Sequence, residues 1–406
     1  MLLPSSTYRT SAFVAAARRL PLDLTVASDF PSTFQDARPD ALTTFDFADP
    51  ARAARQARTF HERHPVHAVV GMDDDTAVLA AAIARELELP GNPVAAMEAA
   101  RDKHRQRRLL ASAGVPIPAF SLHPVAEDPA DAAAGARFPC VLKPLRLAAS
   151  RGVIRADDPA GFVTAHGRLA RILAEPEVAA CGEPARHYLV EEFVPGVEVA
   201  VEGLVHGGEL TVLAVFDKPD PLDGPFFEET IYLTPTRLPA DARAAVASCA
   251  GQAARALGIE RGPVHAEVRW NARGPWLIEV AARPIGGRCS AVLRFGEGLM
   301  SLEELLLRDA LDLPVPSLER ERGAAGVMMI PVPGAGVLRA VHGRAEAAAV
   351  PGVTDVAITA HPGERLVPWP EGARYPGFLF ARGETPAAVE GALREAHRRL
   401  EFELDR

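Results

Sequence analysis

Two glutamates and one arginine stand at spacings that suggest metal and phosphate chemistry in residues 262–287. Glu267 and Glu279 each fall in a segment that alternates apolar and polar residues, and a turn-forming stretch at 271–274 separates the two segments. This pattern predicts a β-hairpin whose paired strands bring both carboxylates to one face. Because neighbouring carboxylates repel each other unless a cation lies between them, the pair favours a Mg²⁺ site. The alternative is a surface hairpin with solvated acids.

The residues that follow the second segment could hold an anion. Arg283 offers a guanidinium that suits a carboxylate or a phosphate, and Gly286 and Gly287 allow a turn in which the backbone approaches a ligand closely. His265, two residues before Glu267, is expected on the same face of its strand. The hairpin therefore predicts a magnesium–phosphate site with an arginine clamp.

A lysine precedes a loop of small residues further upstream. Residues 138–144 indicate a strand with Lys143 near its end, and residues 145–156 indicate a loop with Ser150 and Gly152 that leads into a second strand. The lysine charge, a hydroxyl and backbone N–H groups can together cradle a triphosphate. Neither GxxxxGK[ST] nor GxGxxG occurs, so the phosphate-binding loops of those motifs are not supported. Taken alone, the arrangement also fits a plain hairpin.

The segment at 188–198 could bind the rest of a nucleotide. The backbone groups of Glu192, Phe193 and Val194 could meet an adenine where a strand ends, and Glu198 could accept hydrogen bonds from ribose hydroxyls. A nucleotide needs an apolar cleft for its base and positive charge for its phosphates. This segment would supply the first and the Lys143 segment the second.

Composition limits the class of partner. The chain has 406 residues and a net charge of −9, which argues against nucleic acid as its main ligand. Its four cysteines are scattered without metal-binding spacing, which is typical of reduced thiols in a cytosolic protein. No secretion signal is apparent, and no apolar run approaches the ~20 residues that span a bilayer. We therefore expect a cytoplasmic protein without nucleic-acid or membrane partners, and with two to four domains or subdomains.

The elements around these residues follow two patterns. In the first hundred residues, expected strands at 1–3, 22–27 and 67–71 alternate with expected helices at 11–20, 52–64 and 76–87. This alternation predicts a doubly wound parallel sheet with ligands at the carboxyl ends of its strands. Candidate pocket residues there are Thr7, Tyr8, Arg9 and the run Asp73, Asp74 and Asp75, although acids also stabilise a helix N-terminus.

Two further stretches complete the chain. Residues 95–113 predict one helix that carries Lys103 in a basic run, which would usually be a solvated face. Residues 325–406 predict a strand-rich lobe with strands at 326–331, 336–342, 354–359 and 377–382 and a closing helix at 385–401.

Five segments, in this order, resemble the ATP-grasp superfamily over roughly residues 100–310: RDKHRQRRLLASAGVPIP, FPCVLKP with ASRGV, YLVEEFVPGVEVAVE, HAEV and IEVAARPIGG. The resemblance implies an α/β (α+β) ATP-grasp fold with an N-terminal domain at 1–98, an ATP-grasp domain at 99–312 and a C-terminal lobe at 313–406. Within the ATP-grasp domain it implies a small lobe at about 120–194 and a large lobe at about 195–312. It implies that Glu267 and Glu279 hold Mg²⁺, with Mn²⁺ as a possible substitute. The residues implied to bind ATP are Lys103, Lys143, Ser150, Gly152, Val153, Glu191, Glu192, Phe193, Val194 and Glu198.

Within the superfamily, the AARPIGG ending, the FFEET segment and the C-terminal lobe look most similar to carboxylate–amine ligases of the L-amino-acid (dipeptide) ligase type. This resemblance implies that ATP converts a small carboxylate into an acyl phosphate, which an amine then attacks. It assigns Arg283 and Lys143 as catalytic groups. The substrate-binding residues would be Glu229, His265, Arg283, Gly286 and Gly287, although Glu228 and Glu229 could also be solvated acids.

One departure from the pattern and three open points accompany this reading. Many superfamily members carry an asparagine two residues after the second metal-binding glutamate, where this chain has Ala281, which leaves the second metal site in doubt. A purine-pathway or biotin-carboxylase-like enzyme using formate or bicarbonate is an alternative, and a non-catalytic nucleotide-binding protein is another. Dimers are frequent in this fold, so a homodimer is an open alternative to a monomer.

Overall fold

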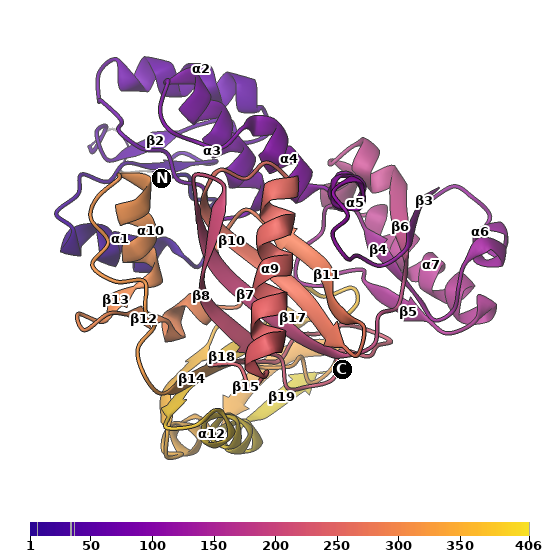
Figure 1. The fold of residues 1–406 in the computed structure, drawn as a ribbon. Coiled ribbons are helices and arrows are strands. Elements are labelled where there is room, and N and C mark those ends of the chain that lie inside the picture. The colour runs from indigo at the N-terminus through magenta and orange to yellow at the C-terminus, as the bar shows by residue number, and fades with distance from the viewer. Residues whose placement is uncertain (6, 33–34, 36, 406) are drawn as a thin grey trace.

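The computed structural model describes residues 1–5, 7–32, 35 and 37–405. An N-terminal domain lies above a large central sheet, a small lobe projects to one side, and C-terminal strands lie at the opposite end of the sheet (Figure 1). The candidate functional site lies where these parts meet.

The N-terminal domain is built on a small parallel sheet. Strands β1 and β2 pair in parallel, and Leu2 makes parallel bridges to Ala27 and Gly71. The strands expected at 1–3 and 67–71 are therefore reduced to single bridging residues. After the first of them, Pro4 lacks the N–H that would extend the ladder. The elements are α1 (Thr10–Arg19), β1 (Val26–Ser28), β2 (Leu42–Thr44), α2 (Pro50–His61) and α3 (Asp74–Glu86).

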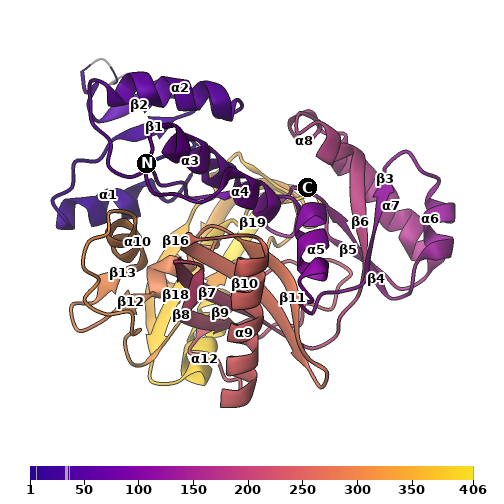
Figure 2. The same cartoon turned by 45° about the horizontal axis from the view of Figure 1, so that its top comes forward.

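The helix expected at 95–113 is broken at Asp102 into α4 (Val94–Arg101) and α5 (Lys103–Ser112), so the prediction of one helix was wrong. Asp102 has extended backbone angles, and its side chain accepts hydrogen bonds from two N–H groups in the first turn of α5. An aspartate in this position starts a new helix. The break places Lys103 at the N-terminus of α5, and Figure 2 shows α3, α4 and α5 leading from the N-terminal domain towards the small lobe.

The small lobe is a four-stranded antiparallel sheet in the order β3-β6-β4-β5, with helices packed on one face. Its core includes Leu142, Phe162 and Tyr188, all buried. Lys143 lies on β4 and Glu191 on the neighbouring β6. The elements are β3 (Phe120–Pro124), α6 (Pro129–Gly135), β4 (Cys140–Pro144), β5 (Ile154–Ala156), α7 (Pro159–Leu173), α8 (Pro176–Ala179), a 3₁₀ turn (Glu183–Arg186) and β6 (His187–Glu192).

The central sheet has eight antiparallel strands in the order β11-β10-β7-β8-β9-β14-β18-β16. Helix α9 covers one face, where Val246, Val264, Val268 and Leu277 are fully buried. The elements are β7 (Val197–His206), β8 (Glu209–Asp217), β9 (Ile231–Thr234), α9 (Ala240–Ala256), β10 (Arg261–Asn271), β11 (Gly274–Ala281), a 3₁₀ turn (Cys289–Val292), β12 (Arg294–Phe295), β13 (Met300–Ser301) and α10 (Leu302–Ala310).

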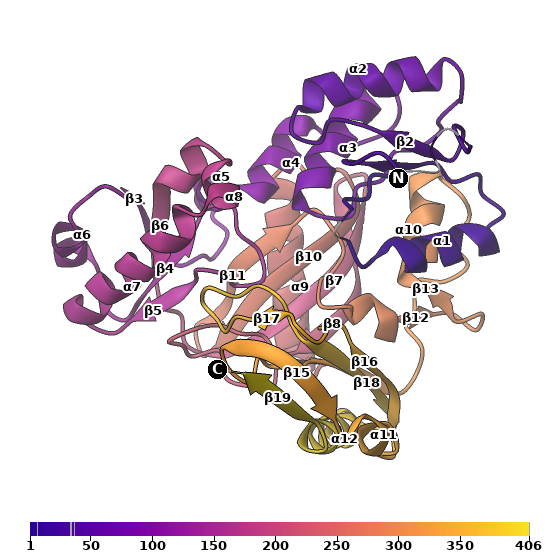
Figure 3. The same cartoon turned by 180° about the vertical axis from the view of Figure 1, so that it is seen from behind.

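The C-terminal strands are divided between two sheets, which the sequence pattern did not indicate. Strands β14, β18 and β16 extend the central sheet beyond β9, because β14 pairs with the edge that β9 would otherwise leave open. Strands β17, β15 and β19 form a separate sheet, visible from behind in Figure 3. The elements are β14 (Ala324–Met329), β15 (Gly336–His342), α11 (Arg344–Ala348), β16 (Val353–Ile358), β17 (Arg365–Leu366), β18 (Gly377–Gly383), α12 (Pro386–Arg398) and β19 (Glu401–Asp405).

Among the described residues, no helix combines the length and the apolar character that crossing a bilayer requires.

Candidate active site

The predicted hairpin is present as β10 and β11. Glu267 and Glu279 are partners in the antiparallel register, so their side chains lie side by side on one face. The predicted pairing of the two glutamates is confirmed, whereas their role as metal ligands stays a prediction. The two carboxylates meet different lysines, which explains how the pair is neutralised in the protein.

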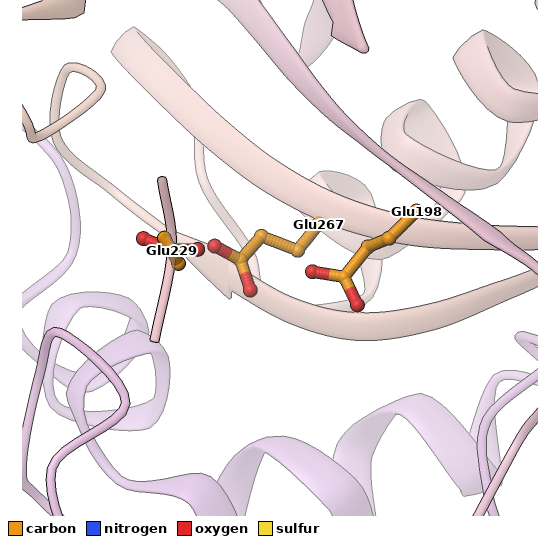
Figure 4. Close-up of side chains that lie close together, drawn as sticks. All are labelled: Glu198, Glu229 and Glu267. Carbon is orange, nitrogen blue, oxygen red and sulfur yellow. The ribbon is translucent and has the colours of Figure 1, made fainter. Parts of the chain in front are cut away.

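Lys218 lies among three carboxylates and was not assigned a role from the sequence. Its Nζ lies 2.8 Å from Glu198, 2.5 Å from Glu229 and 3.0 Å from Glu267. Oxygens of these three glutamates lie within 4.8 Å of one another, and Figure 4 shows the side chains in a row. Carboxylate oxygens are the donors that Mg²⁺ prefers, and here the Lys218 ammonium is the cation that lies among them.

Burial and neighbouring charges have opposite effects on the pKa values of Lys218 and its glutamate partners. Burial tends to lower the pKa of Lys218, but the three glutamates raise it well above its usual range. Burial also acts to raise the pKa of Glu267, which Lys218 and His265 nevertheless hold well below its usual range. For Glu229 burial prevails and raises its pKa to about 7. Lys218 and Glu267 are therefore charged near neutral pH, whereas Glu229 titrates there.

Glu279 is neutralised from the other side of the cleft. Lys103 Nζ lies 2.8 Å from the Glu279 carboxylate and also donates to the Leu147 carbonyl at 2.9 Å. The helix break at Asp102 makes this contact possible, because it places Lys103 in the first turn of α5. The basic run is thus not simply a solvated face, since Lys103 is buried.

Glu191 is committed to an internal ion network. Its carboxylate accepts from Arg107 Nε at 2.7 Å, from Arg107 Nη2 at 3.2 Å and from Lys143 Nζ at 2.7 Å. Burial would raise the pKa of Glu191, but Arg107 and Lys143 lower it to about 2. Glu191 therefore orients Lys143 rather than offering a free side chain to a nucleotide. Arg107, fully buried, was missed because a basic helical run indicated exposure.

A narrow cleft between the small lobe and the central sheet gathers most of the predicted nucleotide-binding residues. Apolar side chains, among them Val141, Leu222, Phe227 and Ile278, line it as well. The predicted residues that line it are Lys103, Lys143, Ser150, Val153, Glu191, Glu192, Phe193, Val194 and Glu198. Gly152 belongs to the same loop, and its N–H donates to the Pro370 carbonyl at 2.9 Å.

Some groups that were expected to contact the nucleotide already have hydrogen-bond partners within the protein. The N–H groups of Glu192 and Phe193 already donate to the carbonyls of Ala119 and Pro139, at 2.9 and 3.0 Å. Glu198 was expected to meet ribose hydroxyls, but its oxygens accept from Lys218 and Arg269, each at 2.8 Å. Both deviations have one cause: these groups are used by contacts between segments far apart in the chain.

A second cavity of about 790 Å³ adjoins the cleft and shares Ser150, Glu267 and Glu279 with it. Three parts of the chain build its wall, including Tyr8 from the N-terminal domain and Tyr375 from the C-terminal region. All five residues predicted to bind substrate line it: Glu229, His265, Arg283, Gly286 and Gly287. The N-terminal candidates Thr7, Arg9, Asp73 and Asp74 line it too.

Arg283 is held by the N-terminal domain. Its Nε lies 3.0 Å from the Asp74 carboxylate, a contact between residues 209 positions apart. Burial acts to lower the pKa of Arg283, but Asp74 raises it further above its usual range. The acidic run has two uses, because Asp73 caps α3 and Asp74 faces the cavity.

His265 lies between two acids, with ring nitrogens 3.7 Å from the carboxylates of Glu202 and Glu267. Burial acts to lower its pKa, yet the two acids raise it overall. The two acids thus favour the protonated, positively charged form of His265 next to Glu267.

The geometry agrees with three family matches. Residues 14–91 match the ATP-grasp N-terminal domain, residues 136–292 the ATP-grasp domain, and residues 328–405 the L-amino acid ligase C-terminal domain 2. The chain belongs to the ATP-grasp superfamily. This ATP-grasp protein is similar in structure to the L-amino acid ligase from Bacillus licheniformis, with a TM-score of 0.82 and 26% identity over 100% of this chain and 98% of that one.

Curated relatives of this ATP-grasp protein are longer than it is. Alanine–anticapsin ligase from Bacillus subtilis (strain 168) is 30% identical over 58% of this chain and 53% of its own length. Carnosine synthase 1 from Mus musculus is 31% identical over 63% of this chain and 32% of its own length. The chain therefore spans only about a third to a half of these two proteins.

Proposed function

We propose that the protein is an ATP-dependent carboxylate–amine ligase that activates a small carboxylate as an acyl phosphate and joins it to an amine, releasing ADP and phosphate. One observation carries the proposal: the lysine-lined cleft and the 790 Å³ cavity share the paired acids Glu267 and Glu279. A phosphoryl group can thus pass from a nucleotide in one space to a carboxylate in the other without leaving the protein.

The nucleotide side of the reaction uses charge and position. The adenine lies against Phe193 and the other apolar residues of the cleft, and Lys103 and Lys143 meet phosphate oxygens. Glu267 and Glu279 would hold Mg²⁺, which when bound neutralises phosphate charge and helps to align it. Glu198 and Glu229 lie beside Glu267, but their oxygens accept from Lys218, so with alanine at position 281 Glu267 and Glu279 would be the protein donors of the metal site.

The substrate side uses the second cavity. A carboxylate oxygen of the first substrate attacks the γ-phosphorus and ADP leaves; the amine nitrogen then attacks the acyl carbon, phosphate leaves and the amine loses a proton. Arg283 pairs with the carboxylate and the acyl phosphate, and Glu229 accepts hydrogen bonds from a substrate ammonium. The amino-acid and dipeptide class fits a cavity that offers both an acid and a guanidinium.

Formate and bicarbonate are poor matches for this cavity. Neither carries an ammonium that Glu229 could bind, and neither needs about 790 Å³. The names of the relatives, alanine–anticapsin ligase and carnosine synthase, also favour amino-acid substrates for this chain.

The test is a screen of ADP release with Mg-ATP and paired L-amino acids, with the mass of each product measured and with formate and bicarbonate as parallel arms. We expect ADP and an amide product with some amino-acid pair. Glu279→Gln should lower turnover at least about 100-fold while the far-UV circular dichroism spectrum stays unchanged. ADP release with bicarbonate but with no amino acid would contradict the proposal.

A further inference from the structure

The loop at 148–153, which would cover the phosphates, is tied to a distant segment of the C-terminal region. The Gly152 N–H donates to the Pro370 carbonyl at 2.9 Å, and Trp369 Nε1 donates to the Ala149 carbonyl at 2.7 Å. Arg151 Nε donates to the Glu371 carbonyl at 2.9 Å. Three consecutive residues, which we call the strap (Trp369, Pro370 and Glu371), thus hold three positions of the loop.

The strap is also fixed to the body of the small lobe. The Glu371 carboxylate accepts from Arg168 Nε at 2.8 Å and from Arg168 Nη2 at 2.6 Å, and Arg168 lies on α7. Hydrogen bonds from Arg168 lower the pKa of Glu371 despite its partial burial. A bidentate pair of this kind has a defined geometry, so it fixes the position of the strap relative to the small lobe and its loop.

The loop has a backbone conformation that needs outside support. Ala149 and Ser150 both have positive φ, 55° and 54°, although neither is a glycine. Residues with a Cβ avoid this region unless their surroundings impose it. The hydrogen bond from Trp369 ends on the first of these two residues, and Ser150 lines both the nucleotide cleft and the substrate cavity.

The strap also leads to the substrate cavity through packed rings. The ring centroids of Trp369 and Tyr375 lie 4.7 Å apart, and those of Tyr375 and Phe378 lie 6.3 Å apart. Tyr375 and Phe378 line the substrate cavity. The same segment of chain therefore touches the substrate space at one end and the phosphate loop at the other.

We propose that Trp369 and Glu371 are positioning residues that hold the 148–153 loop closed over the nucleotide. The inference rests on the proposed ligase function. A loop that stays closed keeps water from the acyl phosphate. When water attacks the acyl carbon in place of the amine, phosphate leaves, the carboxylate is regenerated, and ATP has been hydrolysed to ADP and phosphate without an amide product.

Trp369→Phe is the sharpest test, because it keeps an aromatic ring against Tyr375 and removes only the indole and its N–H. Trp276→Phe is the matched control, since the Trp276 Nε1 group has no hydrogen-bond partner among the described residues. With both substrates present, we expect Trp369→Phe to raise the ratio of ADP to amide product severalfold and to raise KM for ATP, with KM for the amine little changed. The control should keep the wild-type ratio.

The Arg168–Glu371 pair provides an independent variant. Glu371→Arg should raise the same ratio, and the double variant Arg168→Glu with Glu371→Arg should restore it in part. An unchanged ratio in both Trp369→Phe and Glu371→Arg would overturn the proposal.

A readout without catalysis separates this inference from the proposed function. Trypsin can cleave after Arg151 only when the loop opens, so the rate of cleavage there, mapped by mass spectrometry, reports closure. We expect Trp369→Phe to raise this rate about tenfold and Trp276→Phe to leave it unchanged, with equal melting temperatures for both variants. Faster cleavage in an enzyme that joins no amine would refute the ligase proposal but not the closure; an unchanged rate would refute the closure.

Discussion

Replacing Glu191 with glutamine is expected to destabilise the protein and to misplace Lys143. The Glu191 carboxylate is 1% exposed and is bound by Arg107 and Lys143. These two cations lower its pKa from 4.5 to about 2, and a difference of that size corresponds to about 3 kcal/mol of stability. Glutamine keeps the size of the side chain but leaves two buried cations without an anion, so the loss should reach at least this value.

Equilibrium urea unfolding measures this loss. Because the folded pKa is depressed, the stabilisation is fully present above the unfolded value of about 4.5 and is lost as the pH falls towards about 2. The difference between wild type and Glu191→Gln should therefore be constant from pH 8 to about pH 5 and shrink below that. Glu192→Gln is the control, since Glu192 makes no ion pair with any described residue. A Glu191→Gln loss below about 1 kcal/mol, equal to that of the control, would refute the reasoning.

Three further predictions concern charges that line the two cavities or pair with the acids that line them. Lys218→Met removes the cation that Glu198, Glu229 and Glu267 share, so ADP release should fall at least about 100-fold, and an unchanged rate with bound Mg-ATP would exclude a role for Lys218. Asp74→Asn frees Arg283 and should lower kcat/KM for the carboxylate substrate about tenfold, whereas Asp75→Asn, at an 81% exposed side chain, should not. In protein grown with ε-¹³C-labelled lysine, Mg-ATP should shift the side-chain NMR signals of all three lysines, and a signal that does not move would place that lysine outside the site.

The parts of the site that follow from local pattern could be predicted from the sequence. The pairing of Glu267 with Glu279 depends on one hairpin, whose turn and alternation lie within twenty residues of chain. The same is true of Lys143 on its strand and of the acidic start of α3. In each case the contact that matters is made by neighbours in sequence.

The parts that were missed are made by long-range contacts. Arg107 and Glu191 are separated by 84 positions, and Lys218 and Glu267 by 49. The spacing of residues in the basic helix that carries Arg107 does not indicate which of its basic side chains will be buried. The break at Asp102 has a local signal, the helix cap, but its effect on Lys103 depends on where Glu279 lies. The extension of the central sheet by β14 is of the same kind, because the open edge of β9 has no signature in its own residues.

Lysine usage is a signal within the sequence itself that points to Lys218. The chain has 44 lysines and arginines together, but only Lys103, Lys143 and Lys218 are lysines. All three are buried, and each pairs with a glutamate of the candidate active site. Arginine serves in the surface ion pairs, where either cation would do.

The lysine ammonium, a compact charge on a flexible side chain, differs from the planar arginine guanidinium in how it holds its partners. It acts as a point charge that can leave one oxygen for another, whereas arginine is suited to a fixed bidentate partner. In each catalytic cycle the cations of such a site must exchange carboxylate partners for phosphate oxygens. The mobile lysine ammonium suits this exchange. Arg107 and Arg283, by contrast, are held in place by their partners Glu191 and Asp74. On this reasoning, lysine-to-arginine changes at the three positions should impair turnover more than they impair folding, because the charge is kept and only its mobility is lost.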